Sequence, residues 1–146
     1  MTKSIFPRNI VVYVDDDVDD LMMVNEAFSK YAKNVEVALF KDGMEALSYL
    51  KRLSAFDPTP CLIILDINMP KMNGREALHE IRKMSRFQDV PVVMFTTSSQ
   101  LPDKAFSLQY KAGFLTKPLD FSQMEAITDK FIEHCTDDIQ KNIRRI

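Results

Sequence analysis

The sequence has few cysteines, little net charge and no long apolar run. Cys61 and Cys135 do not form a CxxC motif, and a domain of 146 residues buries enough surface to fold without a disulfide or a structural metal. A formal net charge of −2 supplies no basic surface for nucleic acid or for an anionic membrane. Residues 1–9 lack the apolar stretch of a signal peptide, and no segment is long enough to span a membrane. We therefore expect a cytoplasmic protein that binds neither nucleic acid nor membranes.

Two apolar runs that each end in aspartate are the most informative feature that is present. Residues 10–14 read IVVYV and stop at Asp15, Asp16 and Asp17, and residues 62–65 read LIIL and stop at Asp66. Uninterrupted runs of aliphatic and β-branched residues are typical of strands that are buried on both faces of a parallel sheet. The carboxyl ends of such strands lie at one edge of the sheet, where open α/β sheets bind ligands. The sequence therefore predicts a cluster of carboxylates at that edge.

Strand and helix patterns alternate along most of the chain. Further strand patterns cover residues 35–39, 90–95 and 114–116, and amphipathic helical patterns lie between them. This order predicts an α/β fold, a doubly wound (βα)5 five-stranded parallel sheet with helices on both faces, within one domain over residues 8–134. In the C-terminal extension, residues 135–146, isoleucines recur at helical spacing, so we expect this extension to prolong the last helix.

The predicted strand ends combine acidic groups with a hydroxyl and a lysine: Asp15, Asp16, Asp66, Thr96 and Lys117. Two carboxylates about 4 Å apart repel by roughly 4 kcal/mol at an effective dielectric constant near 20. A hard divalent cation such as Mg²⁺ relieves that repulsion, and it also binds phosphate oxygens. A lysine and a hydroxyl on the other side of the cluster suit a phosphoryl group. These residues therefore predict Mg²⁺-dependent phosphoryl transfer to a carboxylate.

The same residues resemble the receiver domains of two-component response regulators. The matching motifs are VDDD at 14–17, LDINMPKMNG at 65–74, TTSS at 96–99 and KP at 117–118, and the likeness covers residues 8–134. The resemblance implies a flavodoxin-like fold. It also implies a role for each matching residue: Asp66 as phosphoacceptor and metal ligand, Asp16 as direct metal ligand, Asp15 as the acid that holds the metal's waters, Asn68 as the residue whose backbone carbonyl binds the metal, and Thr96 and Lys117 as phosphoryl-binding residues.

The resemblance further implies partners and a switch. The phosphoryl group would come from a histidine kinase or a histidine phosphotransfer protein, and Phe114 would turn inward once Thr96 is drawn toward the phosphate. Asn68 and Ser98 would tune the lifetime of the phosphoryl group, and the Lys117–Pro118 bond would be cis. The turn at residues 111–113 is shorter than is usual in this family. Because residues 135–146 alone follow the likeness, we expect no effector domain and a receiver that signals by binding a downstream protein.

Two other interpretations stay open on sequence grounds. A phosphatase resembling the haloacid-dehalogenase family would use the DxD pattern at residues 15–17, although Asp19 stands where that family favours threonine or valine. A pseudo-receiver would keep the fold for protein docking alone, and the short turn before Phe114 is the feature that favours it.

Overall fold

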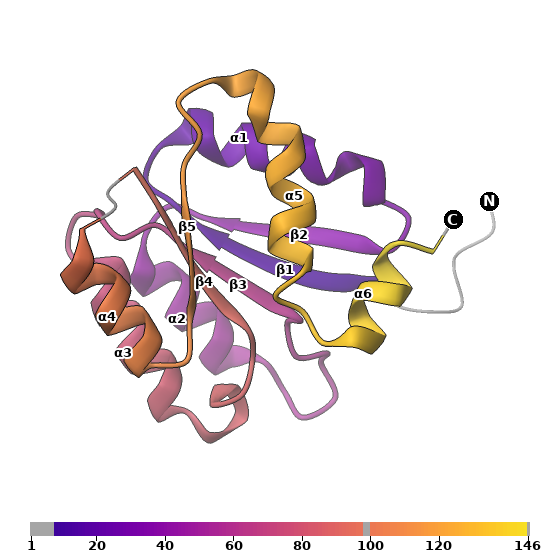
Figure 1. Ribbon diagram of the computed structural model, residues 1–146. Helices are drawn as coiled ribbons and strands as arrows, with labels where there is room; N and C mark the ends of the chain where they lie inside the picture. The colour runs from indigo at the N-terminus through magenta and orange to yellow at the C-terminus, as the bar shows by residue number, and fades with distance from the viewer. Residues whose placement is uncertain (1–7, 98–99, 146) are drawn as a thin grey trace.

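A parallel five-stranded sheet forms the centre of the computed structural model, which describes residues 8–97 and 100–145. The strand order is β2-β1-β3-β4-β5 (Figure 1). The strands are β1 (Asn9–Val14), β2 (Val35–Phe40), β3 (Leu62–Leu65), β4 (Val92–Thr96) and β5 (Gly113–Thr116). All neighbouring pairs are parallel, which confirms the predicted α/β class and the five-stranded sheet.

Helices cover both faces of the sheet, as predicted (Figure 1). One face carries α1 (Val18–Ala27) and α5 (Met124–Ile132), and the other carries α2 (Gly43–Arg52), α3 (Gly74–Lys83) and α4 (Leu101–Gln109). Short 3-10 turns lie at η1 (Phe28–Tyr31), η2 (Ser85–Phe87) and η3 (Phe121–Gln123). Within the described ranges, no helix is both long and apolar enough to cross a membrane.

Strand β1 is buried on both faces, which explains its uninterrupted apolar sequence. Val11 and Tyr13 point into the core beneath α1 and α5, while Val12 and Val14 point into the core beneath α2 and α3. All four side chains are at most 1% exposed. Because alternate side chains of a strand enter opposite cores, both faces have to be apolar.

Strand register then places the acidic strand ends beside one another. Val14 pairs with Leu65, and the Asp66 amide donates to the Val14 carbonyl at 3.0 Å. Thr96 pairs with Thr116, and the Lys117 amide donates to the Thr96 carbonyl at 2.7 Å. The first residue after each of these strands is therefore held at the same edge of the sheet by a ladder hydrogen bond.

The C-terminal extension corrects one prediction. It does not prolong the last helix, because α5 ends at Ile132 and a separate helix α6 (Asp137–Ile143) follows. Thr136 is the N-cap of α6, and its side chain accepts from the Ile139 amide. A threonine followed by two aspartates is a strong helix start, and it overrides the isoleucine spacing. The predicted contribution of Ile146 to that helix lies outside the described residues.

Helix α6 covers the amino end of strand β1 (Figure 1). Its Ile143 is buried in the same core as α1 and α5. The Asn9 amide group donates to the Asn142 side-chain oxygen at 2.7 Å, and the Asn34 amide group donates to the Arg145 carbonyl at 2.8 Å. These contacts lie at the edge of the sheet opposite to the acidic strand ends.

The short turn before β5 is closed by the backbone of Lys111. This residue has a φ of 58°, and the Ala112 amide donates to the Ser107 carbonyl at 2.8 Å. A residue in the left-handed region is a common way to end a helix. The chain therefore passes from α4 to β5 in the few residues that the sequence provides.

Candidate functional site

Strand β1 delivers a fully buried carboxylate to the edge of the sheet. Asp15 is 0% exposed, and its Oδ1 accepts from the Asp17 amide at 2.9 Å. Its Oδ2 accepts from the Tyr13 hydroxyl at 2.6 Å and from Lys117 Nζ at 2.7 Å. Asp16, the next residue, is exposed. The pair therefore consists of one carboxylate fixed by three hydrogen bonds and one that faces solvent.

Asp17 acts as a helix cap. Its Oδ1 accepts from the Asp19 amide at 2.9 Å and from the Asp20 amide at 3.3 Å, so it is the N-cap of α1. Such a cap satisfies helix amides that would otherwise have no partner.

Strand β3 delivers Asp66, which is 6% exposed, and the following loop folds back beneath it. The Gly74 amide donates to the Ile67 carbonyl at 2.8 Å, which brings the start of α3 back to the end of β3. A Cβ on Gly74 would lie 2.2 Å from the Asp66 carbonyl oxygen, so no larger residue fits there without moving the backbone. Lys71, at the outer part of the loop, has a φ of 66°. The position of Asp66 is thus fixed by close backbone contact.

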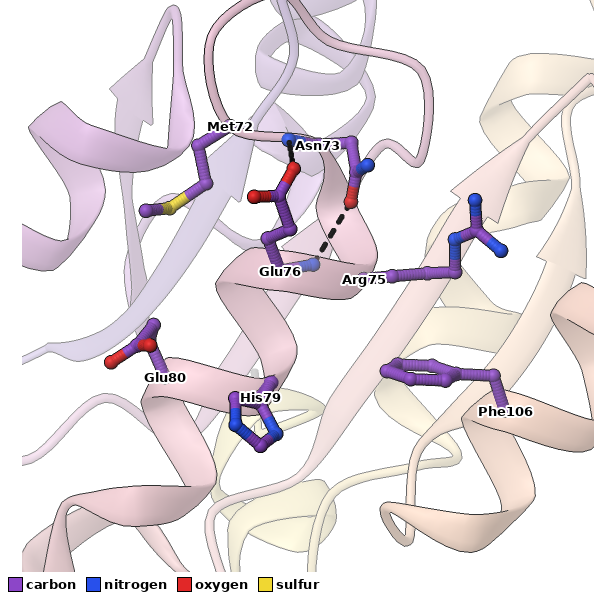
Figure 2. A pocket seen from close by; sticks show the side chains of 7 residues that line it. All are labelled: Met72, Asn73, Arg75, Glu76, His79, Glu80 and Phe106. Atoms are coloured by element: carbon purple, nitrogen blue, oxygen red, sulfur yellow. Dashed lines mark hydrogen bonds between the residues drawn. The ribbon is translucent and has the colours of Figure 1, made fainter.

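A capping box holds the start of α3 in place. The Asn73 side chain accepts from the Glu76 amide at 2.9 Å, and the Glu76 carboxylate accepts from the Asn73 amide at 3.3 Å (Figure 2). These residues also line a cavity of about 480 Å³ with Met72 and with side chains from α3 and α4, including His79 and Phe106 (Figure 2). The reciprocal cap anchors the loop that carries Asp66 to the helix behind it.

Lys117 lies at the centre of the charged cluster. Besides its bond to Asp15, its Nζ donates to Asp20 Oδ2 at 2.8 Å and lies 3.7 Å from Asp66 Oδ1. The ammonium also lies 5.8 Å from the centre of the Phe95 ring. The Lys117–Pro118 bond is trans, so the expectation of a cis bond is wrong. The trans isomer is the lower in energy for an X–Pro bond, by about 0.5–1 kcal/mol.

Burial and neighbouring charges shift the protonation of this cluster. Burial, together with the Asp15 carboxylate, raises the pKa of Asp66 from 3.8 to about 7, against the opposing effect of Lys117. For Lys117, burial alone would lower the pKa, but the hydrogen bonds to Asp15 and Asp20 outweigh it and raise the pKa above its usual value. Burial and then Asp15 raise the pKa of Tyr13, which keeps its hydroxyl a donor.

The three aspartates among the predicted metal-site residues lie close together. Asp15, Asp16 and Asp66 each offer one carboxylate oxygen, and these atoms all lie within 4.8 Å of one another. Carboxylate oxygens are hard ligands that suit Mg²⁺ or Mn²⁺. Burial and the neighbouring Asp15 carboxylate raise the pKa of Asp66, and a divalent cation would offset both effects. Asn68 lies two residues beyond Asp66 in the same loop, with an exposed side chain.

The remaining predicted residues lie along β4 and β5. Thr96, the last residue of β4, is fully buried. Phe114 in β5 is half-buried against the core beneath α2 and α3, and Lys104 Nζ lies 5.7 Å from the centre of its ring. Ser98 lies outside the described residues.

Two residues of the cluster were missed by sequence reasoning, Tyr13 and Asp20. Tyr13 stands two positions before Asp15, and the two-residue period of a strand places both side chains on one face, so this contact could have been anticipated. Asp20 stands in the first turn of α1, where an acidic residue suits the helix dipole, and this local role does not indicate a partner across the site. Its contact with Lys117 joins residues 97 positions apart and depends on how α1 lies against the sheet, for which the sequence contains no signal.

Comparisons with known proteins agree with this geometry. Residues 11–129 match the family model of the response regulator receiver domain. The response regulator Rcp1 of Synechocystis sp. is 30% identical over 143 residues, which cover 93% of this chain and 97% of Rcp1.

Solved structures show the same relationship. The phosphorylated cyanobacterial phytochrome response regulator RcpA is 31% identical, with a TM-score of 0.81 over 90% of this chain and 96% of that one. The Mn²⁺-bound form of Rcp1 is 30% identical, with a TM-score of 0.75 over 88% of this chain and 97% of that one. These matches agree with the acidic residues at the ends of β1 and β3 and with the lysine after β5. The chain therefore belongs to the response regulator receiver domain family of two-component signalling.

Proposed function

We propose that Asp66 accepts a phosphoryl group from a phosphohistidine, with Mg²⁺ as cofactor, and that the phosphorylated protein signals by binding a downstream protein. The observation that carries this proposal is the placement of Asp66. Its carboxylate lies beside Asp15 and Asp16 on one side and 3.7 Å from Lys117 on the other. The donor would be a histidine kinase or a histidine phosphotransfer protein, since receiver domains in general take phosphodonor kinases as partners.

The reaction forms an acyl phosphate. An ionised Asp66 oxygen attacks phosphorus, the P–N bond of the phosphohistidine breaks, and the imidazole leaves with the electron pair of that bond. When bound, Mg²⁺ supplies charge neutralisation to the phosphoryl oxygens. Asp16, Asp66 and the Asn68 backbone carbonyl would hold it directly, and Asp15 would hold its waters.

Lys117 and Thr96 act on the phosphoryl group. The ammonium of Lys117 is close enough to Asp66 to move onto a phosphoryl oxygen, where opposite charge favours it. We propose that the Thr96 hydroxyl donates to another oxygen and that Phe114, half-buried in β5, then turns inward. Asn68 and Ser98 tune the lifetime of the acyl phosphate.

Exposed leucines support signalling by protein contact. Leu101 and Leu108 of α4 are 78% and 79% exposed, and Leu119, which follows β5, is fully exposed. Exposed large apolar side chains are a feature of surfaces that bind other proteins. Receiver domains are signalling proteins rather than classical enzymes. A cytoplasmic location stays a prediction from the sequence.

The phosphatase interpretation would need Asp15 as nucleophile. Both of its oxygens already accept hydrogen bonds, and the side chain is 0% exposed. Asp66, in contrast, is 6% exposed, and its Oδ1 lies 3.7 Å from Lys117 Nζ, which is beyond hydrogen-bond distance. The geometry therefore favours Asp66 as the phosphoacceptor.

The test is phosphorylation by acetyl phosphate in the presence of Mg²⁺, followed by intact mass. The wild-type protein should gain one phosphoryl group, and chelation of the metal should abolish the gain. Asp66→Asn should show none, while Asp57→Asn, a matched change at an exposed aspartate, should behave as wild type. A phosphorylated histidine phosphotransfer protein should label the same residue. Labelling that persists in Asp66→Asn would refute the assignment.

A further inference from the structure

Asp20 makes a contact that its position in helix α1 does not require. The N-terminus of α1 is capped by Asp17, which accepts from the amides of both Asp19 and Asp20. The carboxylate of Asp20 is therefore free of capping, and its side chain is only 15% exposed. Its Oδ2 instead accepts from Lys117 Nζ at 2.8 Å.

This contact changes where the lysine lies. An ammonium has three donors. Two of them are directed to Asp15 at 2.7 Å and to Asp20 at 2.8 Å, whereas Asp66 Oδ1 is 3.7 Å away, beyond hydrogen-bond distance. In this state Lys117 is held on the α1 side of the site, away from the proposed phosphoacceptor.

We propose that Asp20 is a positioning residue that retains Lys117 in the unphosphorylated receiver and thereby limits how readily Asp66 becomes phosphorylated. The inference rests on the proposed function. A residue shifts a two-state equilibrium only when its contacts differ between the two states. The bond from Lys117 to Asp20 belongs to the resting state, because an ammonium that moves onto a phosphoryl oxygen on Asp66 moves away from α1.

Asp15 does not oppose that movement in the same way. Its Oδ2 keeps the hydrogen bond from Tyr13 after Lys117 leaves, and its Oδ1 keeps the bond from the Asp17 amide. Among the residues that the structure describes, Lys117 is the one hydrogen-bond donor to the Asp20 carboxylate. When Lys117 moves away, Asp15 therefore keeps two hydrogen-bond donors, whereas the Asp20 carboxylate loses its donor.

Residue Asp19 provides a matched control. It lies in the same first turn of α1 and carries the same charge, so it has the same favourable interaction with the helix dipole. Its side chain is exposed. Asp19→Asn therefore reports the effect of one lost negative charge near the site, and Asp20→Asn reports that effect plus the release of Lys117.

The first experiment measures binding of beryllofluoride, a phosphoryl mimic, to the full chain at saturating Mg²⁺ by fluorine NMR. Asp20→Asn should bind it about three- to tenfold more tightly than wild type, the range that corresponds to one partly exposed charge-assisted hydrogen bond. The initial rate of labelling by acetyl phosphate should likewise be higher for Asp20→Asn than for wild type. Asp19→Asn should stay within about twofold of wild type. Asp20→Glu, which keeps the charge, should restore values near wild type.

The second experiment needs neither metal nor phosphoryl group. In metal-free protein with isotope-labelled lysine, the ε-methylene NMR signal of Lys117 should shift in Asp20→Asn and should stay in place in Asp19→Asn. The signal is assigned by its loss in Lys117→Met. If Asp66 does not accept a phosphoryl group at all, the proposed function is wrong. This NMR measurement still tests whether Asp20 binds Lys117, because it requires no phosphorylation.

Three results would overturn the inference. One is an Asp20→Asn protein whose beryllofluoride affinity matches that of Asp19→Asn. Another is weaker binding than wild type in a variant whose circular dichroism shows a native fold. The third is a Lys117 signal that is unchanged by Asp20→Asn in metal-free protein.

Discussion

Replacement of Asp66 by asparagine should make the metal-free protein more stable at pH 8 and leave its stability nearly unchanged at pH 4. The reason is that folding takes this carboxylate out of water and places it next to Asp15, which together raise its pKa from 3.8 to about 7. The ionised form of Asp66 is thus less favourable in the folded state than in the unfolded chain. Asparagine has nearly the same shape and no charge, so it removes that penalty.

The pH dependence has a definite sign. Between about pH 4 and pH 7 the folded protein binds a proton at Asp66 that the unfolded chain has released, so the stability of the wild type falls as the pH rises. Above about pH 7 the penalty is constant. A shift of about three pKa units corresponds to roughly 4 kcal/mol. Solvent at the open edge of the site screens part of this, and a buried amide has a desolvation cost of its own, so we expect a net gain of about 2 kcal/mol.

The assay is thermal or urea unfolding of wild type and Asp66→Asn with a chelator present, at several pH values from 4 to 8. A gain of about 2 kcal/mol at pH 8 corresponds to a rise in Tm of about 5 °C for a chain of this length. Saturating Mg²⁺ should stabilise the wild type more than the variant and narrow the gap. Asp89→Asn, a change at a carboxylate that is 94% exposed, serves as the surface control. A gap that is independent of pH, or an Asp66→Asn protein that is less stable than wild type at pH 8, would refute the reasoning.

Two further substitutions test the supports of the site. Tyr13→Phe keeps the ring in the core and removes the hydrogen bond from the Tyr13 hydroxyl to Asp15. We expect the free energy of unfolding to fall by about 1–2 kcal/mol and Mg²⁺ binding, measured by calorimetry, to weaken. An unchanged free energy of unfolding would show that this hydrogen bond does not stabilise the fold. Gly74→Ala places a Cβ against the backbone of Asp66, so we expect the free energy of unfolding to fall by more than about 2 kcal/mol and acetyl phosphate to label little of the protein. The control Ala77→Gly, in the same helix, should also lower the free energy of unfolding but should leave labelling of the folded protein intact.

The parts of the fold that sequence predicted well are those fixed by local pattern. Strand β3 was expected at residues 62–65 and lies there, because LIIL has no alternative to burial on both faces. Strand β1 was expected at residues 10–14 and is one residue longer. The carboxylate cluster followed from these two strands, since parallel pairing brings their ends together whatever the details of the loops.

The parts that sequence did not predict depend on contacts between distant segments or on competing local signals. Helix α6 is separate because the cap at Thr136 is stronger than the isoleucine spacing. The trans bond at Pro118 and the partner of Asp20 depend on how the loop after β5 and helix α1 settle on the sheet. The Asp20 side chain, which lies in the first turn of α1, is thus part of the charged cluster.

The charge balance of the site supports the proposed movement of Lys117. In the described part of the chain, Lys117 lies within 3.7 Å of carboxylate oxygens of Asp15, Asp20 and Asp66, and Asp16 lies beside Asp15 and Asp66, so carboxylates outnumber the lysine in the site. Asp15, Asp16 and Asp66 would hold a divalent cation, whose charge would relieve that excess and weaken the hold of the carboxylates on the lysine. A phosphoryl group on Asp66 would add negative charge at a point where the lysine has no short contact in this structure. On the proposal above, both changes would favour the same displacement of Lys117, and Asp20 would oppose it.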